Sequence, residues 1–257
     1  MVRGLYTAYT GMLNQQKKMD TLSNNLANAD TTGYKKEGVT AKTFETQLAI
    51  KVKDGSNAYI DQQIGKLNLG VKIGENYTDY SQGSYRYTGN KYDLALGGDG
   101  FFNISFMNKA GEQSVKYTRD GNFTIDNEGA LRTQDGDYVL GESGEIYIPT
   151  NAVDVSINKL GEIYADGEYI DTIKITDFED YNYLKKYGEN MYDAVDGATE
   201  KEPTATIDQG YLEQSNINVV TEMVNMISLS RTYEANQKLI QTMDDALDKS
   251  ANQIGKV

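Results

Sequence analysis

Residues 219–254 read VVTEMVNMISLSRTYEANQKLIQTMDDALDKSANQI and place an apolar side chain at every seventh position. The repeat is carried by Val219, Met226, Tyr233, Ile240, Leu247 and Ile254. Leu229 and Met243 stand three residues after two of these, and Asn236 and Ser250 are polar at the equivalent places. Apolar residues at the first and fourth places of a heptad are typical of coiled coils, so this stretch predicts one long helix with a narrow apolar seam.

The N-terminus has the same spacing. Its seam consists of Leu5, Met12, Met19 and Leu26, with Ala8 and Leu22 three residues after two of them. Gln15 breaks the pattern once. We expect a helix from about Gly4 to Ala29 that ends at Gly33, because glycine adopts the left-handed conformation that commonly ends helices. A helix with so thin an apolar face is stable only when that face is packed, so the two ends need each other or other copies.

The residues between the two ends have a different period. Residues 91–180 alternate short apolar pairs with turn residues, which predicts a central antiparallel β domain. Asp-Gly pairs at 99–100, 120–121, 135–136 and 166–167 predict tight hairpins, because both residue types accept the positive φ angles of such turns.

The sequence therefore predicts an α+β fold in which the N- and C-terminal helices pair as a coiled-coil stalk beside a central antiparallel β-rich domain. Five segments follow along the chain: an N-terminal helix (1–33), a connector with extended segments (34–90), the β domain (91–180), a return connector (181–215) and a C-terminal helix (216–257). Within the first connector, Phe44 and Leu48 suggest a short helix. Ser215-Asn216 is the expected N-cap region of the last helix.

Composition excludes several kinds of site. The chain of 257 residues contains no cysteine and no histidine, so it offers no thiolate, no imidazole base and none of the commonest zinc ligands. We expect no cofactor, no metal ion and no catalytic residue. The formal net charge of −13 argues against nucleic acid as a partner, because such binders need clustered Lys and Arg.

The charge is unevenly distributed. Residues 1–42 hold six basic and three acidic residues, and residues 211–257 hold four basic and six acidic residues. The ends are thus weakly opposite in sign, and residues 43–210 carry most of the negative charge. Opposite signs favour pairing of the ends modestly, since salt screens exposed charges.

Several motifs occur in a fixed order. Near the N-terminus they are Ser23-Asn24-Asn25-Leu26-Ala27-Asn28 and Thr32-Gly33-Tyr34-Lys35. In the middle they are Tyr117-Thr118-Arg119-Asp120-Gly121-Asn122-Phe123 and Asp126-Asn127-Glu128-Gly129. Near the C-terminus they are residues 210–219 (GYLEQSNINV), 222–227 (EMVNMI) and 231–236 (RTYEAN). Together they resemble the signatures of bacterial flagellar rod and hook proteins. The resemblance covers both ends and the middle, whereas residues 35–90 match only at scattered positions such as Gln82-Gly83-Ser84.

The resemblance implies a structural subunit of the flagellar basal-body rod, most like the distal rod protein or a close rod paralogue. The family's terminal helices form the inner tube of a helical polymer that transmits torque, and its β domain faces outward. The implied partners are further copies of the chain, other rod and hook proteins and the flagellar export apparatus. The implied location is the flagellum basal body in the cell envelope, reached by type III export.

The N-terminus also lacks the apolar segment and cleavage site of a secretory signal, and no stretch approaches the roughly 18–20 apolar residues of a membrane span. We therefore expect export without a cleavable signal peptide and no membrane insertion.

Four asparagines are candidates for setting the alignment of the helices: Asn24, Asn25, Asn28 and Asn236. The simpler alternative for each is a tolerated polar position on a helix. A buried asparagine in a seam favours one register at some cost in stability, and only Asn236 lies on the predicted seam. For the apolar seams of the two terminal helices, the simpler alternative to packing between copies is packing on the β domain of the same molecule.

Other functions fit less well. Asp126 and Glu128 do not complete a calcium loop, because Thr124 and Asp135 would occupy its first and twelfth places. A glycoside hydrolase needs only two carboxylates, but the chain has no Trp for sugar stacking. Three classes remain: a rod or hook subunit, a secreted carbohydrate-active enzyme, and an adhesin whose β domain binds a ligand.

Overall fold

The computed structural model describes residues 2–45, 47–51, 62–108 and 111–254. A helix stands at each end of the chain and an antiparallel β-rich region lies between them in the sequence, which confirms the α+β class. The described residues form two compact units. The first unit draws on the ranges Met1–Ala27, Glu37–Thr78 and Asn218–Val257, and the second on Asn28–Lys36 and Asp79–Ile217.

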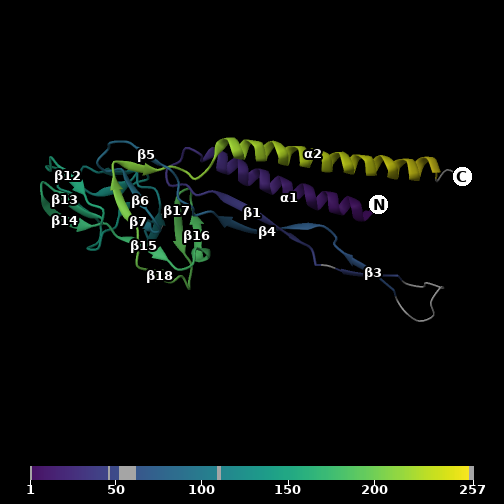
Figure 1. Cartoon of the computed structure of the whole chain (residues 1–257), viewed down its shortest axis with the longest axis horizontal. Helices are drawn as coiled ribbons and strands as arrows, with labels where there is room; N and C mark the ends of the chain where they lie inside the picture. The colour runs from purple at the N-terminus through teal and green to yellow at the C-terminus, as the bar shows by residue number, and fades with distance from the viewer. Residues whose placement is uncertain (1, 46, 52–61, 109–110, 255–257) are drawn as a thin grey trace. The chain divides into compact units, whose positions relative to one another are not determined.

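The first unit is built around two long helices, α1 (Val2–Ala27) and α2 (Val219–Lys249), and α2 continues into a π-helical turn (Ser250–Ile254). The helices pack side by side, and α1 also packs against strands β1 and β4 (Figure 1). The N-cap of α2 is Asn218, whose side chain accepts a hydrogen bond from the Thr221 N–H at 3.0 Å. The predicted cap at Ser215-Asn216 is therefore wrong by two residues. Neither described helix is both long enough and apolar enough to cross a membrane.

The first unit also contains two antiparallel strand pairs, which are β1 (Glu37–Thr43) with β4 (Val71–Thr78) and β2 (Gln47–Lys51) with β3 (Gln62–Leu67). The short helix suggested at Phe44 and Leu48 is wrong. Leu48 lies in β2, opposite Lys66, and the Phe44 N–H donates to the Gly70 carbonyl at 3.1 Å. Pairing with a strand distant in sequence satisfies these backbone groups, and a local apolar pair does not reveal it.

The second unit is a set of antiparallel sheets. In the largest sheet the strands follow one another in the order β16 (Leu184–Tyr187), β17 (Met191–Ala194), β8 (Gln113–Thr118), β7 (Phe101–Met107), β11 (Tyr138–Val139), β10 (Leu131–Thr133) and β9 (Phe123–Ile125). A further strand of this sheet, β15 (Ile175–Phe178), pairs with both β7 and β18 (Glu200–Lys201). Beside it are β12 (Val155–Ile157), β13 (Glu162–Ala165) and β14 (Glu168–Thr172), the pair β6 (Leu94–Gly97) and β19 (Thr206–Gln209), the pair β5 (Tyr85–Tyr87) and β20 (Tyr211–Glu213), and a 3-10 turn at Tyr181–Tyr183.

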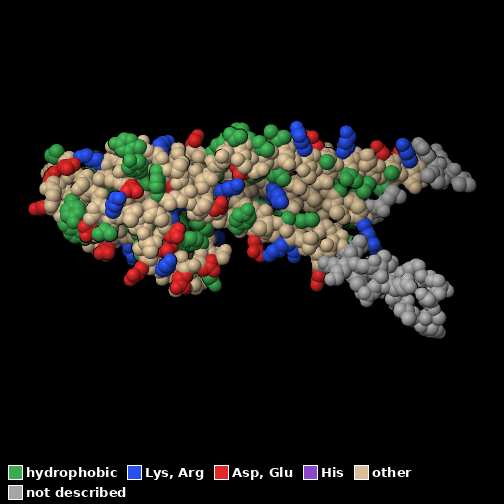
Figure 2. All heavy atoms as spheres, in the orientation of Figure 1, with side chains coloured by type: hydrophobic (Ala, Val, Ile, Leu, Met, Phe, Trp, Pro, Cys, Tyr) green, Lys and Arg blue, Asp and Glu red, His purple; other side chains and the backbone are tan. Residues whose placement is uncertain are grey.

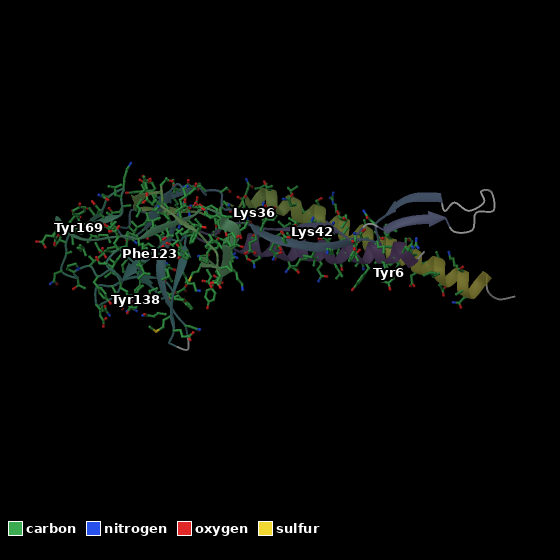
Figure 3. The ribbon with its side chains drawn as sticks, turned by 90° about the horizontal axis from the view of Figure 1, so that it is seen from below. Tyr6, Lys36, Lys42, Phe123, Tyr138 and Tyr169 are labelled. Atoms are coloured by element: carbon green, nitrogen blue, oxygen red, sulfur yellow. The ribbon has the colours of Figure 1, made fainter. Side chains whose placement is uncertain are left out.

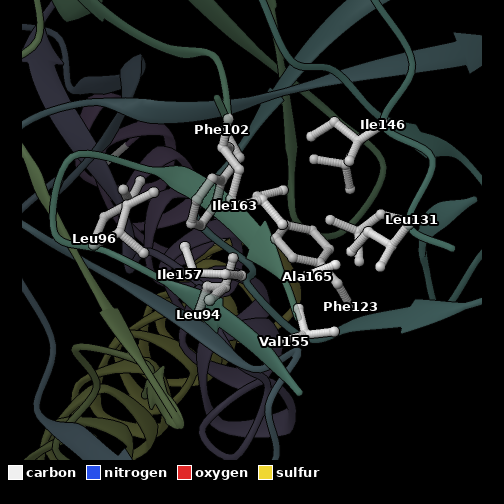
Figure 4. Close-up of a cluster of buried hydrophobic side chains, with 14 residues drawn as sticks. Leu94, Leu96, Phe102, Phe123, Leu131, Ile146, Val155, Ile157, Ile163 and Ala165 are labelled. Atoms are coloured by element: carbon white, nitrogen blue, oxygen red, sulfur yellow. The ribbon is translucent and has the colours of Figure 1, made fainter. Parts of the chain in front are cut away.

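Two buried clusters lie on opposite faces of β7, because successive strand residues point to opposite sides. Phe102 belongs to an aliphatic cluster with side chains such as Leu94, Leu131 and Ile163 (Figure 4). Phe101 belongs to a second, aromatic cluster with Tyr117, Phe178, Leu184 and Tyr192. The second unit therefore has its own core, and its fold does not depend on the long helices for burial.

Two of the four Asp-Gly hairpin predictions are confirmed. Asp135-Gly136 joins the paired strands β10 and β11, and Asp166-Gly167 joins β13 and β14 with φ angles of 51° and 88°. The predictions at 99–100 and 120–121 are wrong, because the flanking strands pair with other partners. Gly121 instead allows the backbone to approach Leu94 closely, since a Cβ on residue 121 would overlap the Leu94 carbonyl oxygen.

Candidate assembly interface

The predicted seam of α2 is the face that this helix buries in a single copy. Six predicted seam residues are half-buried: Met226, Leu229, Tyr233, Asn236, Ile240 and Met243. Glu222, which is not among the predicted seam residues, is fully buried on the same face. The remaining described side chains of α2, apart from Ser230, are exposed, including Val219 and Leu247 at the ends of the repeat. Ile254 lies outside the residues whose side chains are described. Burial thus follows the heptad but is incomplete.

The matching seam of α1 is covered to a similar degree. Leu5, Met12, Met19, Leu22 and Leu26 are all half-buried, and Ala8 is buried. Two glycines let the helices approach closely, because a Cβ on Gly4 would lie 2.7 Å from Met243 Cε and one on Gly11 would lie 3.4 Å from Asn236 Nδ2. From the first contact to the second, the position on α1 rises by seven residues, from 4 to 11, while the position on α2 falls by seven, from 243 to 236. The helices are therefore antiparallel and aligned by the heptad.

The four asparagines have different surroundings. Asn236 is half-buried opposite Gly11, and Asn24 is an exposed residue of α1. Asn25 is fully buried and clamps the start of β1, since its Nδ2 donates to the Glu37 carbonyl at 2.8 Å and its Oδ1 accepts from the Glu37 N–H at 3.0 Å. Asn28 lies one residue beyond α1, where its Oδ1 accepts from the Thr31 hydroxyl at 3.2 Å.

A buried ion cluster lies in the second unit, and we call Lys35, Arg119 and Glu213 the latch. Lys35 Nζ lies 2.6 Å from Glu213 Oε1, and Arg119 NH1 lies 3.5 Å from Glu213 Oε2. The Gly83 N–H also donates to Glu213 Oε1 at 2.8 Å. Lys35 and Glu213 are each only 1% exposed. The latch joins the chain just after α1 to the chain just before α2, across 178 residues of sequence.

The electrostatics of the latch make each member depend on the others. Burial lowers the pKa of the Lys35 ammonium below its ordinary value, and the Glu213 carboxylate opposes that shift. Lys35 Nζ also donates to the Ser81 carbonyl at 2.9 Å, and the Arg119 guanidinium lies 5.2 Å from the centre of the Phe101 ring. A buried charge is tolerated only when it is paired and hydrogen-bonded, so removal of one partner is costly.

Backbone contacts extend the same junction. The Gly33 N–H donates to the Glu213 carbonyl at 2.9 Å, and Asn216 Oδ1 accepts from the Lys36 N–H at 2.8 Å. Asn216 Nδ2 donates to the Asp79 carbonyl, also at 2.8 Å. Three segments distant in sequence are thus held together where the chain enters and leaves the second unit.

Gly33 allows the sharpest stability test at this junction. Its φ is +66°, and a Cβ would lie 2.5 Å from the Arg119 carbonyl carbon and 2.7 Å from Asp120 Cα. We expect Gly33→Ala to destabilise the second unit by at least about 2 kcal/mol, through strain together with backbone overlap. Chemical denaturation of the purified chain would measure the change.

The control is Gly188→Ala. Gly188 has the same φ of +66° but has nothing within 4 Å of a built Cβ, so this variant isolates the conformational cost of about 1 kcal/mol. Equal losses for the two variants would show that close packing at Gly33 contributes nothing.

Asp120 connects the central motif to the junction. Its carboxylate accepts from the Thr32 hydroxyl at 2.7 Å, the Asn122 N–H at 3.1 Å and Asn190 Nδ2 at 3.3 Å. Burial raises the pKa of Asp120, and these hydrogen bonds oppose the rise. The residue therefore holds the turn after β8 against residues 32 and 190, which explains why the Asp-Gly pair is not a hairpin.

The periodicity of the sequence did not indicate that three charged residues of the two units are buried. Lys35, Glu213 and Glu222 are charged yet buried, and charged residues are seldom fully buried unless they are paired. The only available signal was their position, since Lys35 and Glu213 lie within the motifs that flank the helices and Glu222 occupies a heptad place three residues after Val219.

Comparison with known proteins adds three family matches in the order of the motifs. Residues 5–35 match the family "Flagella basal body rod protein". Residues 95–165 match "Flagellar hook protein FlgE/F/G D1 domain", and residues 208–254 match "Flagellar basal body rod FlgEFG protein C-terminal". The two outer matches include most of α1 and all of α2, and the central match lies in the second unit.

Similarity to individual proteins extends over nearly the whole chain. The flagellar basal-body rod protein FlgG of Bacillus subtilis (strain 168) is 36% identical over 98% of this chain and 99% of its own length. The rod protein FlgF of Caulobacter vibrioides is 32% identical over 100% of both chains. The flagellar hook-basal body complex protein FlhO of Bacillus subtilis is 30% identical, again over 100% of both.

Proposed function

Because the chain belongs to the flagellar basal-body rod protein family and is a structural subunit of that rod, we propose that its terminal helices build the wall of a helical tube from many copies. In this proposal α1 and α2 pair as a coiled coil, and neighbouring copies cover what one copy leaves exposed. The half-buried state of both seams supports the proposal most directly, since Met226, Tyr233 and Ile240 keep part of their surface open.

The five segments expected from the sequence take distinct parts in this proposal. The helices of residues 1–33 and 216–257 form the tube, and the β domain of residues 91–180 faces outward. Residues 34–90 and 181–215 carry the chain between these parts and also contribute strands to the two units, and the latch at Lys35 and Glu213 holds the first residues of one connector against the last residues of the other. The proposed interface positions are 17 of the residues named from the sequence: Leu5, Met12, Met19, Leu22, Leu26, Asn24, Asn25, Asn28, Val219, Met226, Leu229, Tyr233, Asn236, Ile240, Met243, Leu247 and Ile254.

The mechanical role follows from packing. A seam buried continuously through many copies resists twisting, because close-packed interiors deform little and transmit strain. A contact between unlike surfaces that does not close into a ring produces such a filament. The proposed task is to transmit torque along the axis from motor to hook, and it needs no catalytic residue, so we propose that the chain is not an enzyme.

Membership of the family suggests assembly with other rod and hook proteins at the flagellum basal body. We propose in addition that the chain associates with itself and passes through the flagellar export apparatus without a cleavable signal. It binds no nucleic acid in this account, given its net charge of −13. A place in the hook is the second candidate, which the match of residues 95–165 to the hook protein FlgE/F/G D1 domain favours.

Adjacent residues of α2 provide the test. Ile240 is half-buried in the seam, and its neighbour Gln241 is exposed. We expect Ile240→Asp to abolish swimming and rod assembly, because a charge in the seam costs several kcal/mol unless it is paired. Gln241→Asp adds the same charge outside the seam and is expected to leave both unchanged.

The measurements are swimming in soft agar and electron microscopy of isolated basal bodies. Circular dichroism of each purified variant confirms that the second unit is folded. Rods of normal length with Ile240→Asp would contradict the proposed role of the seam.

A further inference from the structure

The first unit leaves a second apolar surface of α2 uncovered, on the face away from its seam. Val220, Met223, Val224 and Ile227 follow the spacing of one helix face, and we call them the α2 stripe. Val220 is 71% exposed and Val224 is 60% exposed. Figure 2 shows hydrophobic side chains gathered over the beginning of α2. Four large apolar side chains this exposed on one face mark an interaction surface.

An apolar pocket lies elsewhere in the same unit, and we call it the α1 pocket. It has a volume of about 390 Å³ and is lined by Tyr6 and Thr10 of α1 and by Phe44 and Leu69 at the ends of the adjoining strands, with Arg3 and Glu45 at the same site. Tyr6 is 60% exposed and lies near the beginning of α1 (Figure 3). The pocket is lined by α1 and the adjoining chain, whereas the stripe is the face of a single helix.

The stripe and the pocket are far apart in one copy. The alignment of Gly4 with Met243 and of Gly11 with Asn236 places Thr10 level with about Gln237. Val224 is about 13 residues away along α2, which at 1.5 Å per residue is about 20 Å. The α2 stripe of a molecule therefore cannot fill its own α1 pocket.

Charges next to the two surfaces are complementary. The pocket carries Glu45 and Arg3, both exposed. The same face of α2 continues past the stripe into Arg231 and Glu234, which are also exposed. A copy docked by its stripe can therefore place Arg231 near Glu45 of the next copy, and Glu234 near its Arg3. Such complementarity fixes register more than it adds affinity.

We propose that the α2 stripe of one copy docks into the α1 pocket of a second copy of this chain. The inference rests on the proposed function and specifies which surfaces meet. Because the stripe and the pocket are different surfaces displaced along the unit, their contact is heterologous and leaves one of each free at the ends of any pair. It therefore extends into an open assembly and does not stop at a closed dimer.

The chain has no cysteine, so paired cysteines can test this contact without background. Cells lacking their own copy would co-express two full-length variants, Leu69→Cys and Val224→Cys, and isolated basal bodies would be oxidised mildly. We expect a disulfide-linked dimer only when both variants are present. Each variant carries a single cysteine, so a link can form only between two copies, and it requires their Cα atoms to lie about 4.4–6.8 Å apart. Gln241→Cys replaces Val224→Cys in the control and is expected to give no dimer with Leu69→Cys.

Three other results of the crosslinking experiment would contradict the proposed contact. A dimer formed by Val224→Cys alone would show that stripes pair with each other and would overturn the proposal. Assembled rods without any link between the two cysteines would also overturn it, while leaving the proposed function intact. A chain that never enters rods, even without substitution, would overturn both.

A charge exchange gives a second, independent measurement. Glu45→Arg alone and Arg231→Glu alone each place like charges at the contact, and we expect at least a tenfold loss of assembled rods for each. Co-expression of the two variants restores opposite charges at every contact of an alternating assembly, and assembly is expected to recover. Failure to recover, with both variants folded and exported, would contradict the proposed pairing.

Discussion

Deleting residues 1–27 is expected to abolish rod assembly and swimming while leaving the second unit folded. The deletion removes α1 and with it the surface that covers the seam of α2, so α2 loses most of its packing and most of its helical stability. The second unit keeps both of its buried clusters and all three members of the latch, because residues 28–36 remain. Motility agar and electron microscopy would show the first effect, and thermal unfolding of the purified chain the second.

The boundary of this deletion matters for its interpretation. A longer deletion, of residues 1–36, also removes Gly33 and Lys35, and leaves Glu213 buried without its ammonium partner. We expect that variant to lose assembly and also to unfold the second unit at a lower temperature. Among the three classes considered, only the rod or hook subunit makes the shorter deletion fatal with the β domain intact. Swimming by cells that carry the shorter deletion would refute the assembly role of α1.

The second large effect is expected for Glu213→Ala, at about 3–5 kcal/mol of destabilisation of the second unit. The substitution leaves two buried cations, Lys35 and Arg119, without a carboxylate, and leaves the Gly83 N–H without its acceptor. Because burial lowers the pKa of Lys35 and Glu213 opposes that shift, the variant is expected to lower it further. Denaturant unfolding of the full chain at neutral pH is the measurement.

Asp154→Ala is the matched control for this prediction. Asp154 also pairs with a lysine in the second unit, at 3.1 Å from Lys91 Nζ, but its side chain is 79% exposed. Exposed ion pairs contribute little, so the loss is expected to stay below about 1 kcal/mol. If Glu213→Ala cost no more than the control, the latch would have no special importance for stability.

The helices were predictable because their signal is local. Met226, Tyr233 and Ile240 recur every seven residues, and the structure half-buries all three on one face. The hairpins at 135–136 and 166–167 were predictable for the same reason, since two turn residues supply the φ angles that join neighbouring strands.

The errors and omissions came from contacts distant in sequence. At Asp120-Gly121 the same dipeptide serves a close approach to Leu94 and hydrogen bonds from Thr32 and Asn190, which no local pattern reveals. The latch joins Lys35 to Glu213 across 178 residues, and each looks like an ordinary surface charge in its own segment. The strands of residues 37–43 and 47–51 pair with strands of residues 71–78 and 62–67, and the glycines of these segments obscure any period in the sequence.

Both seams are only partly covered in one molecule, and we propose that neighbouring copies complete them. Hydrogen exchange of α2, residues 219–249, compared between dilute monomer and assembled rods, tests it most directly. We expect rapid exchange along most of α2 in the monomer and strong protection in the rod. Slow exchange throughout α2 at low concentration, unchanged on assembly, would contradict it.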